Sequence, residues 1–355
     1  MFLLSRSFSA SISLLVLYPS KSKHIKPLCS SKALSFRLVN FPEKQIEGKD
    51  CLRVFCVVLS FSNRIFAISG NLGSGKTTLL KCISGLEKIN SGSILLNGQV
   101  LNNDKIFVKP QERKIGFIFQ DYPLFPHLNL KENILFNLID SLKSNIDYIL
   151  SLTNLEKLIN RYPHELSGGE QQRACIARAL IREPELLLMD EPFSNLDSQI
   201  KESIKEEIFK IIKKTNTTTI LVTHDIKDCL NISDKILIFK AGVLQQYDDP
   251  EKMYCEPANC YCAKILGDLN KVVLKNKNYY LRPESLKIVK KSNFEVKIDK
   301  CFFQGKDYKV RCFYKDEIWY FNSIQNLKKS EIIYLDFNKN DLMFFDSLCE
   351  DYFKN

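Results

Sequence analysis

Apolar and polar segments alternate between residues 52 and 240 in a way that predicts strands and helices in turn. Runs rich in β-branched and aromatic residues predict strands at 52–61, 64–69, 93–97, 114–120, 186–189, 217–223 and 235–240. Apolar positions with helical spacing predict helices at 77–85, 169–182, 200–214 and 225–232. The run at 186–189 is apolar throughout, as in a parallel strand that is covered on both faces. This alternation predicts an α/β core with a mostly parallel sheet.

Residues 121–174 interrupt that alternation. The pattern over 130–160 is mostly helical, with breaks at Asn and Ser residues, so we predict a helical subdomain inserted into the α/β core. Asn97-Gly98 follows a strand candidate and is typical of a tight hairpin turn.

The pattern of predicted elements changes again after about residue 267. Short strand candidates follow at 272–280, 285–289, 294–303, 308–314, 318–321 and 332–337, and turn signals such as Gly305-Lys306-Asp307 separate them. This pattern predicts a small all-β domain, either an OB-like barrel or a sandwich. We therefore predict an N-terminal extension at 1–50, an α/β domain at 51–266 and a β domain at 267–355.

The N-terminal extension differs in composition from the rest of the chain. Residues 1–42 contain six Lys or Arg and no Asp or Glu, and they are rich in Ser. That composition is typical of a transit peptide and, more weakly, of a signal sequence. The other interpretation, which we favour slightly, is a tail from an upstream start codon that does not fold.

The overall charge and the apolar runs limit the classes of function. A net charge of +10 fits a nucleic-acid or anionic membrane partner, and it also fits the solvated surface of a Lys-rich protein. No segment approaches the roughly 20 apolar residues of a membrane-spanning helix, so a transport function would need a pore formed by other chains. Cys255, Cys260 and Cys262 form a cluster among twelve cysteines, but its spacing is not that of a zinc site.

A glycine-rich segment between a predicted strand and a predicted helix fits the P-loop pattern G-x4-G-K-[ST]. Its glycines allow backbone N–H groups to approach phosphate oxygens, and the helix N-terminus adds partial positive charge. Lys76 supplies a full positive charge to the same oxygens, and the Thr77 hydroxyl is a ligand for Mg²⁺. We predict that the phosphates of ATP bind Gly70, Asn71, Gly73, Ser74, Gly75, Lys76, Thr77 and Thr78.

Two adjacent carboxylates end the buried strand candidate at 186–189. Asp190 lies where a P-loop protein holds its metal, so we predict that it binds Mg²⁺. Glu191 follows directly, and a second carboxylate beside the metal ligand suits a general base or a group that orients water.

A further motif carries a resemblance to a known family, the ATP-binding subunits of ABC transporters. Its signature sequence is matched by Leu166-Ser167-Gly168-Gly169-Glu170-Gln171-Gln172-Arg173. The resemblance covers roughly residues 52–355 and implies a P-loop NTPase core with a C-terminal TOBE-type β domain. It also implies a homodimer in which Ser167, Gly168, Gly169 and Glu170 of one subunit contact the ATP held by the P-loop of the other.

The same resemblance assigns three further residues. Gln120 matches the Q-loop, which contacts Mg²⁺ or the attacking water and faces the membrane subunits. Asp197 matches the D-loop at the dimer interface, and His224 matches the switch histidine that contacts the γ-phosphate. With Glu191, these assignments imply that Glu191, His224 and Gln120 are the catalytic group. The aromatic residue that stacks on adenine is not identified, and Phe41, Phe55 and Phe61 are candidates.

The resemblance also indicates the kind of transporter. Residues 87–126 are most similar to molybdate- and sulfate-type importers, whereas Tyr280-Leu281-Arg282-Pro283-Glu284 and the β domain resemble a part shared by iron(III), polyamine, sulfate and sugar importers. We expect an inorganic ion, with an oxyanion ahead of ferric iron and a polyamine or sugar as the alternative. A soluble, non-transport ABC protein that acts on nucleic acid or ribosomes is the alternative of another class.

An importer of this kind implies partners and a location. We expect integral membrane permease subunits and an external substrate-binding protein as partners, and no nucleic acid. The chain would lie at the cytoplasmic face of the inner membrane, as a peripheral protein. A genuine transit peptide would instead place it in an organelle.

Overall fold

The computed structural model describes residues 56–59, 63–196, 198–315 and 317–345, so the predictions for residues 1–50 lie outside the described part. The chain divides into two compact units between Pro250 and Glu251. The second unit therefore includes α9 (Cys260–Ile265), together with the strands that follow it. The domain ranges given above, with a boundary after residue 266, stay a prediction.

The first unit is built on a six-stranded sheet. Five of its strands are parallel, and the sixth, at one edge, is antiparallel; in sheet order they are β5 (Ile115–Ile118), β6 (Leu186–Asp190), β7 (Thr218–Val222), β2 (Ile65–Ser69), β8 (Lys235–Lys240) and β9 (Val243–Asp248). Every residue of β2 and β7 is buried. The predicted α/β core with a mostly parallel sheet is confirmed.

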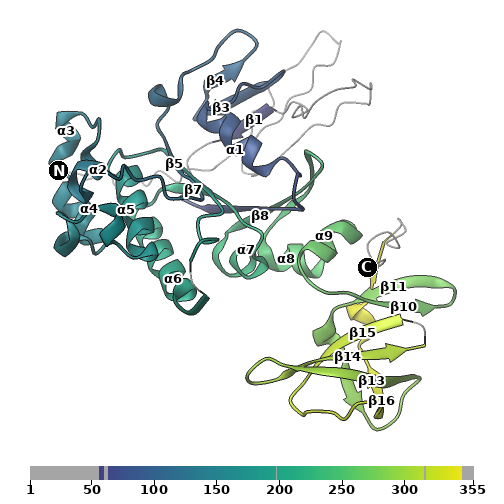
Figure 1. Ribbon diagram of the computed structural model, residues 1–355. Helices are drawn as coiled ribbons and strands as arrows, with labels where there is room; N and C mark the ends of the chain where they lie inside the picture. Colours follow the sequence, from purple (N-terminus) through teal and green to yellow (C-terminus); the bar gives the residue numbers. More distant parts are fainter. Residues whose placement is uncertain (1–55, 60–62, 197, 316, 346–355) are drawn as a thin grey trace, which may run out of the picture. The chain divides into compact units, whose positions relative to one another are not determined.

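Alternate residues of the central strands face two different hydrophobic clusters. Leu186 and Leu188 of β6 pack with α1 (Lys76–Ser84), whereas Leu187 and Met189 pack with α5 (Gly168–Leu180) and α6 (Ser198–Thr215). Figure 1 shows α1 on one side of the sheet, with α6 and α7 (Ile226–Ile232) on the other. Both faces are covered, which explains why β6 is apolar throughout.

The inserted region is helical, as predicted, but its helices are short. They are α2 (Leu130–Leu135), α3 (Asp140–Lys143), α4 (Ile146–Leu152) and the 3-10 turns Glu156–Leu158 and Pro163–Glu165. Asn137 and Asn154 have left-handed φ angles of 50° and 53°, a conformation that interrupts a right-handed helix and that Asn tolerates well.

A smaller sheet comprises β1 (Cys56–Leu59), β3 (Ser93–Leu96) and β4 (Gln99–Asn103). Asn97 and Gly98 join β3 to β4 with φ angles of 50° and 82°, so the predicted hairpin turn is confirmed. The 3-10 turn Pro110–Glu112 leads from this sheet to β5.

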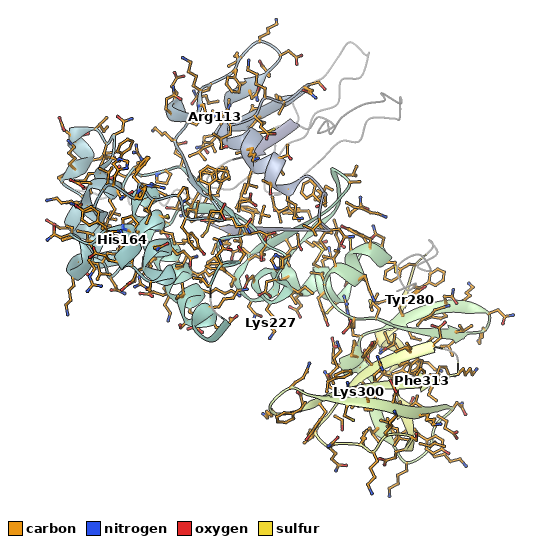
Figure 2. The ribbon with its side chains drawn as sticks, in the orientation of Figure 1. Arg113, His164, Lys227, Tyr280, Lys300 and Phe313 are labelled. Carbon is orange, nitrogen blue, oxygen red and sulfur yellow. The ribbon has the colours of Figure 1, made fainter. Side chains whose placement is uncertain are left out.

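Arg113 connects the smaller sheet to the end of α1. Its buried guanidinium donates to the carbonyl oxygens of Cys82 (2.9 Å) and Ile83 (2.5 Å) in the last turn of α1, and to that of Leu101 in β4 (3.2 Å). Figure 2 labels this side chain among those of the smaller sheet. A cation at a helix C-terminus is favourable for the helix dipole, so Arg113 fixes the helix whose other end forms the P-loop.

The second unit contains two antiparallel sheets. One comprises β10 (Asn270–Leu274), β11 (Lys277–Leu281) and β17 (Met343–Phe344). The other comprises, in sheet order, β12 (Lys287–Val289), β16 (Ile332–Asp336), β13 (Phe294–Phe303), β14 (Tyr308–Tyr314) and β15 (Glu317–Ser323). The helix α8 (Pro250–Cys255) and the 3-10 turns Pro283–Ser285 and Lys339–Asp341 complete the elements. A C-terminal all-β domain was predicted, and the strands bear this out.

The core of the second unit surrounds Trp319. Its side chain is fully buried in a cluster with residues such as Val310 and Phe321, and its Nε1 donates to the Lys271 carbonyl (2.8 Å). The prediction of one strand at 272–280 is wrong, because β10 and β11 form a hairpin there. Lys275 and Asn276 make its turn, with φ angles of 47° and 57°.

Two kinds of feature are absent from the described residues. None of their helices is long and apolar enough to cross a membrane. Their His, Cys, Asp and Glu side chains form no group of three or more that could hold a metal ion, and this includes the cysteine cluster of α8 and α9.

Candidate nucleotide site

Gly70 is the first residue of the loop between β2 and α1, and only glycine fits the backbone there. A Cβ on Gly70 would lie 2.2 Å from the carbonyl oxygen of Phe239 in β8, and φ there is 151°. The loop is held by bonds from the Ser74 N–H to the Asn71 carbonyl (3.2 Å) and from the Gly242 N–H to the Ser74 carbonyl (3.0 Å). Gly75 caps α1 with a φ of 90° and no side-chain bond, so the first N–H groups of α1 receive no side-chain cap.

Lys76 lies at the centre of this loop. Its Nζ donates to the carbonyls of Gly70 (2.8 Å) and Asn71 (2.9 Å) and to Ser74 Oγ (3.2 Å). The residue is 9% exposed. Burial lowers the pKa of Lys76, and the nearby carboxylates of Glu191 and Asp190 oppose that shift. The loop therefore holds a cation beside uncapped helix N–H groups, which is an arrangement that binds phosphate.

Asp190 ends β6 beside the first turn of α1. The Thr77 hydroxyl donates to its Oδ1 (3.2 Å), while Thr78 lies next to it in the same turn. Burial raises the pKa of Asp190, the Thr77 bond opposes this shift, and the charge of Glu191 adds to it. A desolvated carboxylate next to a hydroxyl is an oxygen pair that suits Mg²⁺. The residues predicted to hold that ion thus have the chemistry for it.

Glu191 and His224 form a pair at the carboxyl ends of β6 and β7. Because these strands are parallel neighbours, with Asp190 opposite Val222, the residues that follow them meet at one edge of the sheet. The distance from His224 Nδ1 to Glu191 Oε2 is 3.1 Å, and the two side chains are 66% and 23% exposed. Glu191 has a left-handed φ of 44°, and its N–H donates to the Val222 carbonyl (3.0 Å).

The segment after β5 is joined to the segment after Glu191. Gln120 is exposed, and its carbonyl accepts from Asn195 Nδ2 (3.1 Å). The carbonyl of Pro192, which follows Glu191, accepts two further bonds. One comes from the hydroxyl of Tyr122, and the other comes from Nε2 of Gln172 in α5 (2.9 Å). Asp197, and the adenine candidates Phe41, Phe55 and Phe61, lie outside the described residues.

The signature residues form the N-terminal turn of α5. Ser167 caps the helix: its Oγ accepts from the Glu170 N–H (3.4 Å) and donates to Glu170 Oε2 (2.8 Å). Burial acts to raise the pKa of Glu170, but the bonds from the Ser167 backbone and side chain, with Arg173 and Arg161 nearby, lower it overall. A Cβ on Gly169 would lie 2.3 Å from Ile204 Cδ1, and one on Gly168 would lie 3.8 Å from Leu196.

The structure thus brings most of the predicted residues into two groups. The P-loop, Asp190, Glu191 and His224 lie together at one edge of the sheet, whereas Ser167, Gly168, Gly169 and Glu170 form the first turn of α5, which packs against α6 at Gly169. Among the described residues, no hydrogen bond joins the signature turn to the P-loop.

Sequence reasoning assigned no role to three residues near this site, although Gln172 is part of the signature sequence. Tyr122 and Gln172 are 7% and 0% exposed, and neither residue type signals a role by itself. Lys205 of α6 is also buried, at 2% exposure, with its Nζ 2.5 Å from Asp228 and 3.2 Å from Asp225. A lysine on the apolar stripe of an amphipathic helix is the signal that could have found it.

Residues 60–194 of the chain match the family model described as ABC transporter. A spermidine/putrescine import ATP-binding protein from Clostridioides difficile (strain 630) is 32% identical over 313 residues, covering 79% of this chain and 89% of that protein. A sulfate/thiosulfate import ATP-binding protein from Mesostigma viride is 34% identical and covers 69% and 77%. An Fe(3+) ions import ATP-binding protein from Haemophilus influenzae (strain 86-028NP) is 35% identical and covers 70% and 82%.

Proposed function

This chain belongs to the ABC transporter family, as an ATP-binding subunit of an importer, and from that premise we propose how its residues bind ATP, hydrolyse it and drive import. ABC family membership, ATP binding and ATPase activity coupled to transport were predicted from the sequence and are confirmed. The relatives named above are import proteins, so the alternative of a non-transport protein acting on nucleic acid or ribosomes is not supported.

The P-loop residues hold the phosphates of ATP. The backbone N–H groups of the loop and of the first turn of α1 donate to phosphate oxygens, and Lys76 neutralises part of their charge. Thr77, Asp190 and Gln120 would hold Mg²⁺, which would supply further positive charge to the phosphates. Desolvation of Asp190 supports this assignment, since a cation restores the charged form of a carboxylate that burial disfavours.

The pair of Glu191 and His224, 3.1 Å apart beside Lys76 and Asp190, is the observation that carries the mechanism. Glu191 accepts the proton of the attacking water as general base. An ionised carboxylate only accepts hydrogen bonds, so the His224 proton lies on Nδ1 and points at Glu191. Nε2 carries a proton as well only in the imidazolium form, and in that form it donates to a γ-phosphate oxygen.

The signature turn completes the site of a second copy of the chain. Ser167, Gly168, Gly169 and Glu170 form the N-terminus of α5, and the N–H groups at a helix N-terminus bind anions. This turn therefore receives a γ-phosphate that the partner's P-loop holds. Asp197 lies at the interface of the two copies. Two subunits therefore enclose two ATP molecules, and hydrolysis separates them.

A substitution of Glu191 tests this mechanism. Glu191→Gln keeps the shape and the bond to His224 but removes the base, so hydrolysis falls by about 100-fold or more while ATP still binds. The variant accumulates as a dimer in ATP, as seen by size-exclusion chromatography. Glu183→Gln, on the exposed turn before β6, is the matched control. A Glu191→Gln protein that hydrolyses ATP at the wild-type rate refutes the assignment.

The remaining partners follow from the importer family. Integral membrane permease subunits form the pore, and an external binding protein delivers the substrate. The chain is then a peripheral protein at the cytoplasmic face of the inner membrane, or at an organelle membrane if residues 1–50 are a transit peptide.

The transported substrate is an inorganic ion, with an oxyanion of the molybdate or sulfate type ahead of ferric iron. Support comes from relatives named for sulfate/thiosulfate and for Fe(3+). A polyamine is the second candidate, because the relative named for spermidine/putrescine matches over 89% of its length. The three identities, 32%, 34% and 35%, do not separate these substrates.

The substrate is tested in cells whose only copy of the gene is wild type, Glu191→Gln or the Glu183→Gln control. Molybdenum, sulfur, iron and polyamine contents are measured together under limitation. Selective loss of molybdenum or sulfur in the Glu191→Gln cells supports the oxyanion. Selective loss of iron or of polyamines replaces it with that substrate.

A further inference from the structure

The carbonyl oxygen of Pro192, directly after Glu191, accepts two buried hydrogen bonds from side chains far away in the sequence. Tyr122 donates its hydroxyl from the segment that follows Gln120, and Gln172 donates Nε2 (2.9 Å) from α5, the signature helix. Pro192 is itself buried. A carbonyl has two lone pairs, so this acceptor is fully used.

These two bonds hold a backbone that is strained. Glu191 has a φ of 44°, a conformation that is uncommon for a residue with a side chain. The proline that follows restricts Glu191 further, because its ring crowds the preceding residue. Such a conformation persists only when the surroundings hold it in place. The turn from Glu191 to Ser194 supplies part of that hold, since the Ser194 N–H (3.2 Å) and Oγ (2.9 Å) donate to the Glu191 carbonyl.

Gln172 makes this bond at a cost to the core around it. The residue is 0% exposed, and its Oε1 has no hydrogen-bond partner in the described part of the chain. The amide cannot be turned to relieve this, because its oxygen would then face the Pro192 carbonyl. A buried amide with an unpaired oxygen destabilises a fold, so general stability does not explain Gln172.

Tyr122 is directed inward by an unusual backbone of its own. Its φ is 46°, and its carbonyl accepts from the Leu124 N–H (2.7 Å). Burial raises the pKa of Tyr122 to about 12, so the hydroxyl stays a donor at neutral pH. The residue lies two positions after Gln120, in the segment that faces the membrane subunits in the proposed function.

We propose that Tyr122 and Gln172 are positioning residues for Glu191: together they clamp the Pro192 carbonyl and aim the carboxylate at His224. The clamp comes from the Q-loop and from the signature helix, so both must be in place for Glu191 to act. The inference rests on the role proposed above for Glu191.

Tyr122→Phe removes one oxygen atom and tests the first half of the clamp. In the full-length protein, we expect kcat for ATP to fall about tenfold, since a small misplacement of a reacting group is costly. The KM for ATP changes less than twofold, because no P-loop contact is lost. Tyr148→Phe, on the exposed face of α4, is the matched control and keeps the wild-type kcat.

Gln172→Met tests the second half by separating activity from stability. The substitution removes the donor and also the unpaired oxygen, so the melting temperature stays equal or rises while kcat falls about tenfold. A kcat that falls only with a lower melting temperature would indicate a structural role and overturn the proposal.

A double-mutant cycle with Glu191→Gln distinguishes this inference from the function beneath it. If Tyr122 acts through Glu191, Tyr122→Phe causes no further loss in single-turnover hydrolysis by the Glu191→Gln protein. If Tyr122→Phe lowers the rate of hydrolysis tenfold in both the wild-type and the Glu191→Gln proteins, this inference is wrong, but the proposed role of Glu191 stands. If the single variant Glu191→Gln hydrolyses ATP at the wild-type rate, the proposed role of Glu191 is wrong.

Discussion

The P-loop and the signature turn are both glycine turns at helix N-termini, but they differ in charge and in capping. In the P-loop, no side chain caps α1, and the buried cation of Lys76 lies against the turn. In the signature turn, Ser167 and Glu170 cap α5, and Glu170 brings a negative charge. The first turn is thus prepared for an anion, whereas in the second a side chain already accepts from one N–H group, that of Glu170.

This difference explains why the two turns would act in sequence. An anion that approaches the signature turn alone meets a carboxylate whose pKa is lowered by its bonds to Ser167 and by nearby arginines. A phosphate that is already neutralised by a P-loop and a metal ion meets much less repulsion. The comparison therefore predicts that ATP binds the P-loop first and the partner's signature turn afterwards.

Removal of the P-loop cation has the largest expected effect. Lys76→Ala lowers the affinity for ATP by about 100-fold or more, because a phosphate loses a charge-assisted bond. Binding is measured by titration calorimetry. Lys81→Ala, on the same helix with its side chain 41% exposed, is the control and binds normally. Wild-type affinity in Lys76→Ala would contradict the P-loop assignment.

A mixture of two inactive proteins tests whether the turns belong to different subunits of one site. Lys76→Ala and Ser167→Arg each abolish hydrolysis, because each homodimer lacks one component at both sites. Half of the dimers in an equal mixture are mixed, and each has one intact site, so about a quarter of the wild-type rate returns. A mixture that stays inactive argues against composite sites.

The tight packing of the signature turn predicts a loss of stability. Gly169→Ala places a Cβ against Ile204 Cδ1 and costs about 2 kcal/mol of unfolding free energy, measured by urea denaturation. Ile204→Val, which removes that methyl group, restores most of the loss in the double variant. If Gly169→Ala and the wild-type protein have equal unfolding free energies, Ile204 of α6 moves aside without a loss of stability.

The smallest expected effect concerns Asp190. Burial raises its pKa above 3.8, so the folded state binds the proton more tightly than the unfolded chain does. Stability therefore falls as the pH rises from 3.8 through the raised pKa. Asp190→Asn raises the melting temperature slightly at pH 7, and the gain disappears at a pH well below 3.8. A melting temperature of Asp190→Asn below that of the wild-type protein at pH 7 would contradict the predicted direction of the change.

The local features of the fold and the site were predictable from the sequence. Three of these features depend only on residues that are close together in the sequence: the P-loop, the strand that ends at Asp190 and the Asn97-Gly98 hairpin. Their local sequence patterns are therefore enough to predict their geometry. The pairing of Glu191 with His224 also follows, once the two strands are taken as parallel neighbours.

The tertiary contacts were not predictable. Tyr122 and Gln172 meet at Pro192 only because the inserted helices fold back onto β6, and no spacing along the chain encodes that contact. The β10–β11 hairpin was missed because Lys275 is an uncommon residue for a left-handed turn position. Lys205 lies in a segment for which the sequence predicts only a helix, and its pairing with Asp228 depends on the approach of α7.

The burial of Trp319 gives the protein a built-in fluorescent reporter. It is the one tryptophan in the chain, and it lies in the core of the C-terminal unit. Its emission therefore follows the melting of that unit, whereas far-ultraviolet circular dichroism is dominated by the helices of the ATP-binding unit. Two separate transitions in the two signals would show that each unit unfolds independently, and an ATP-induced shift in the dichroism transition alone would locate nucleotide binding in the first.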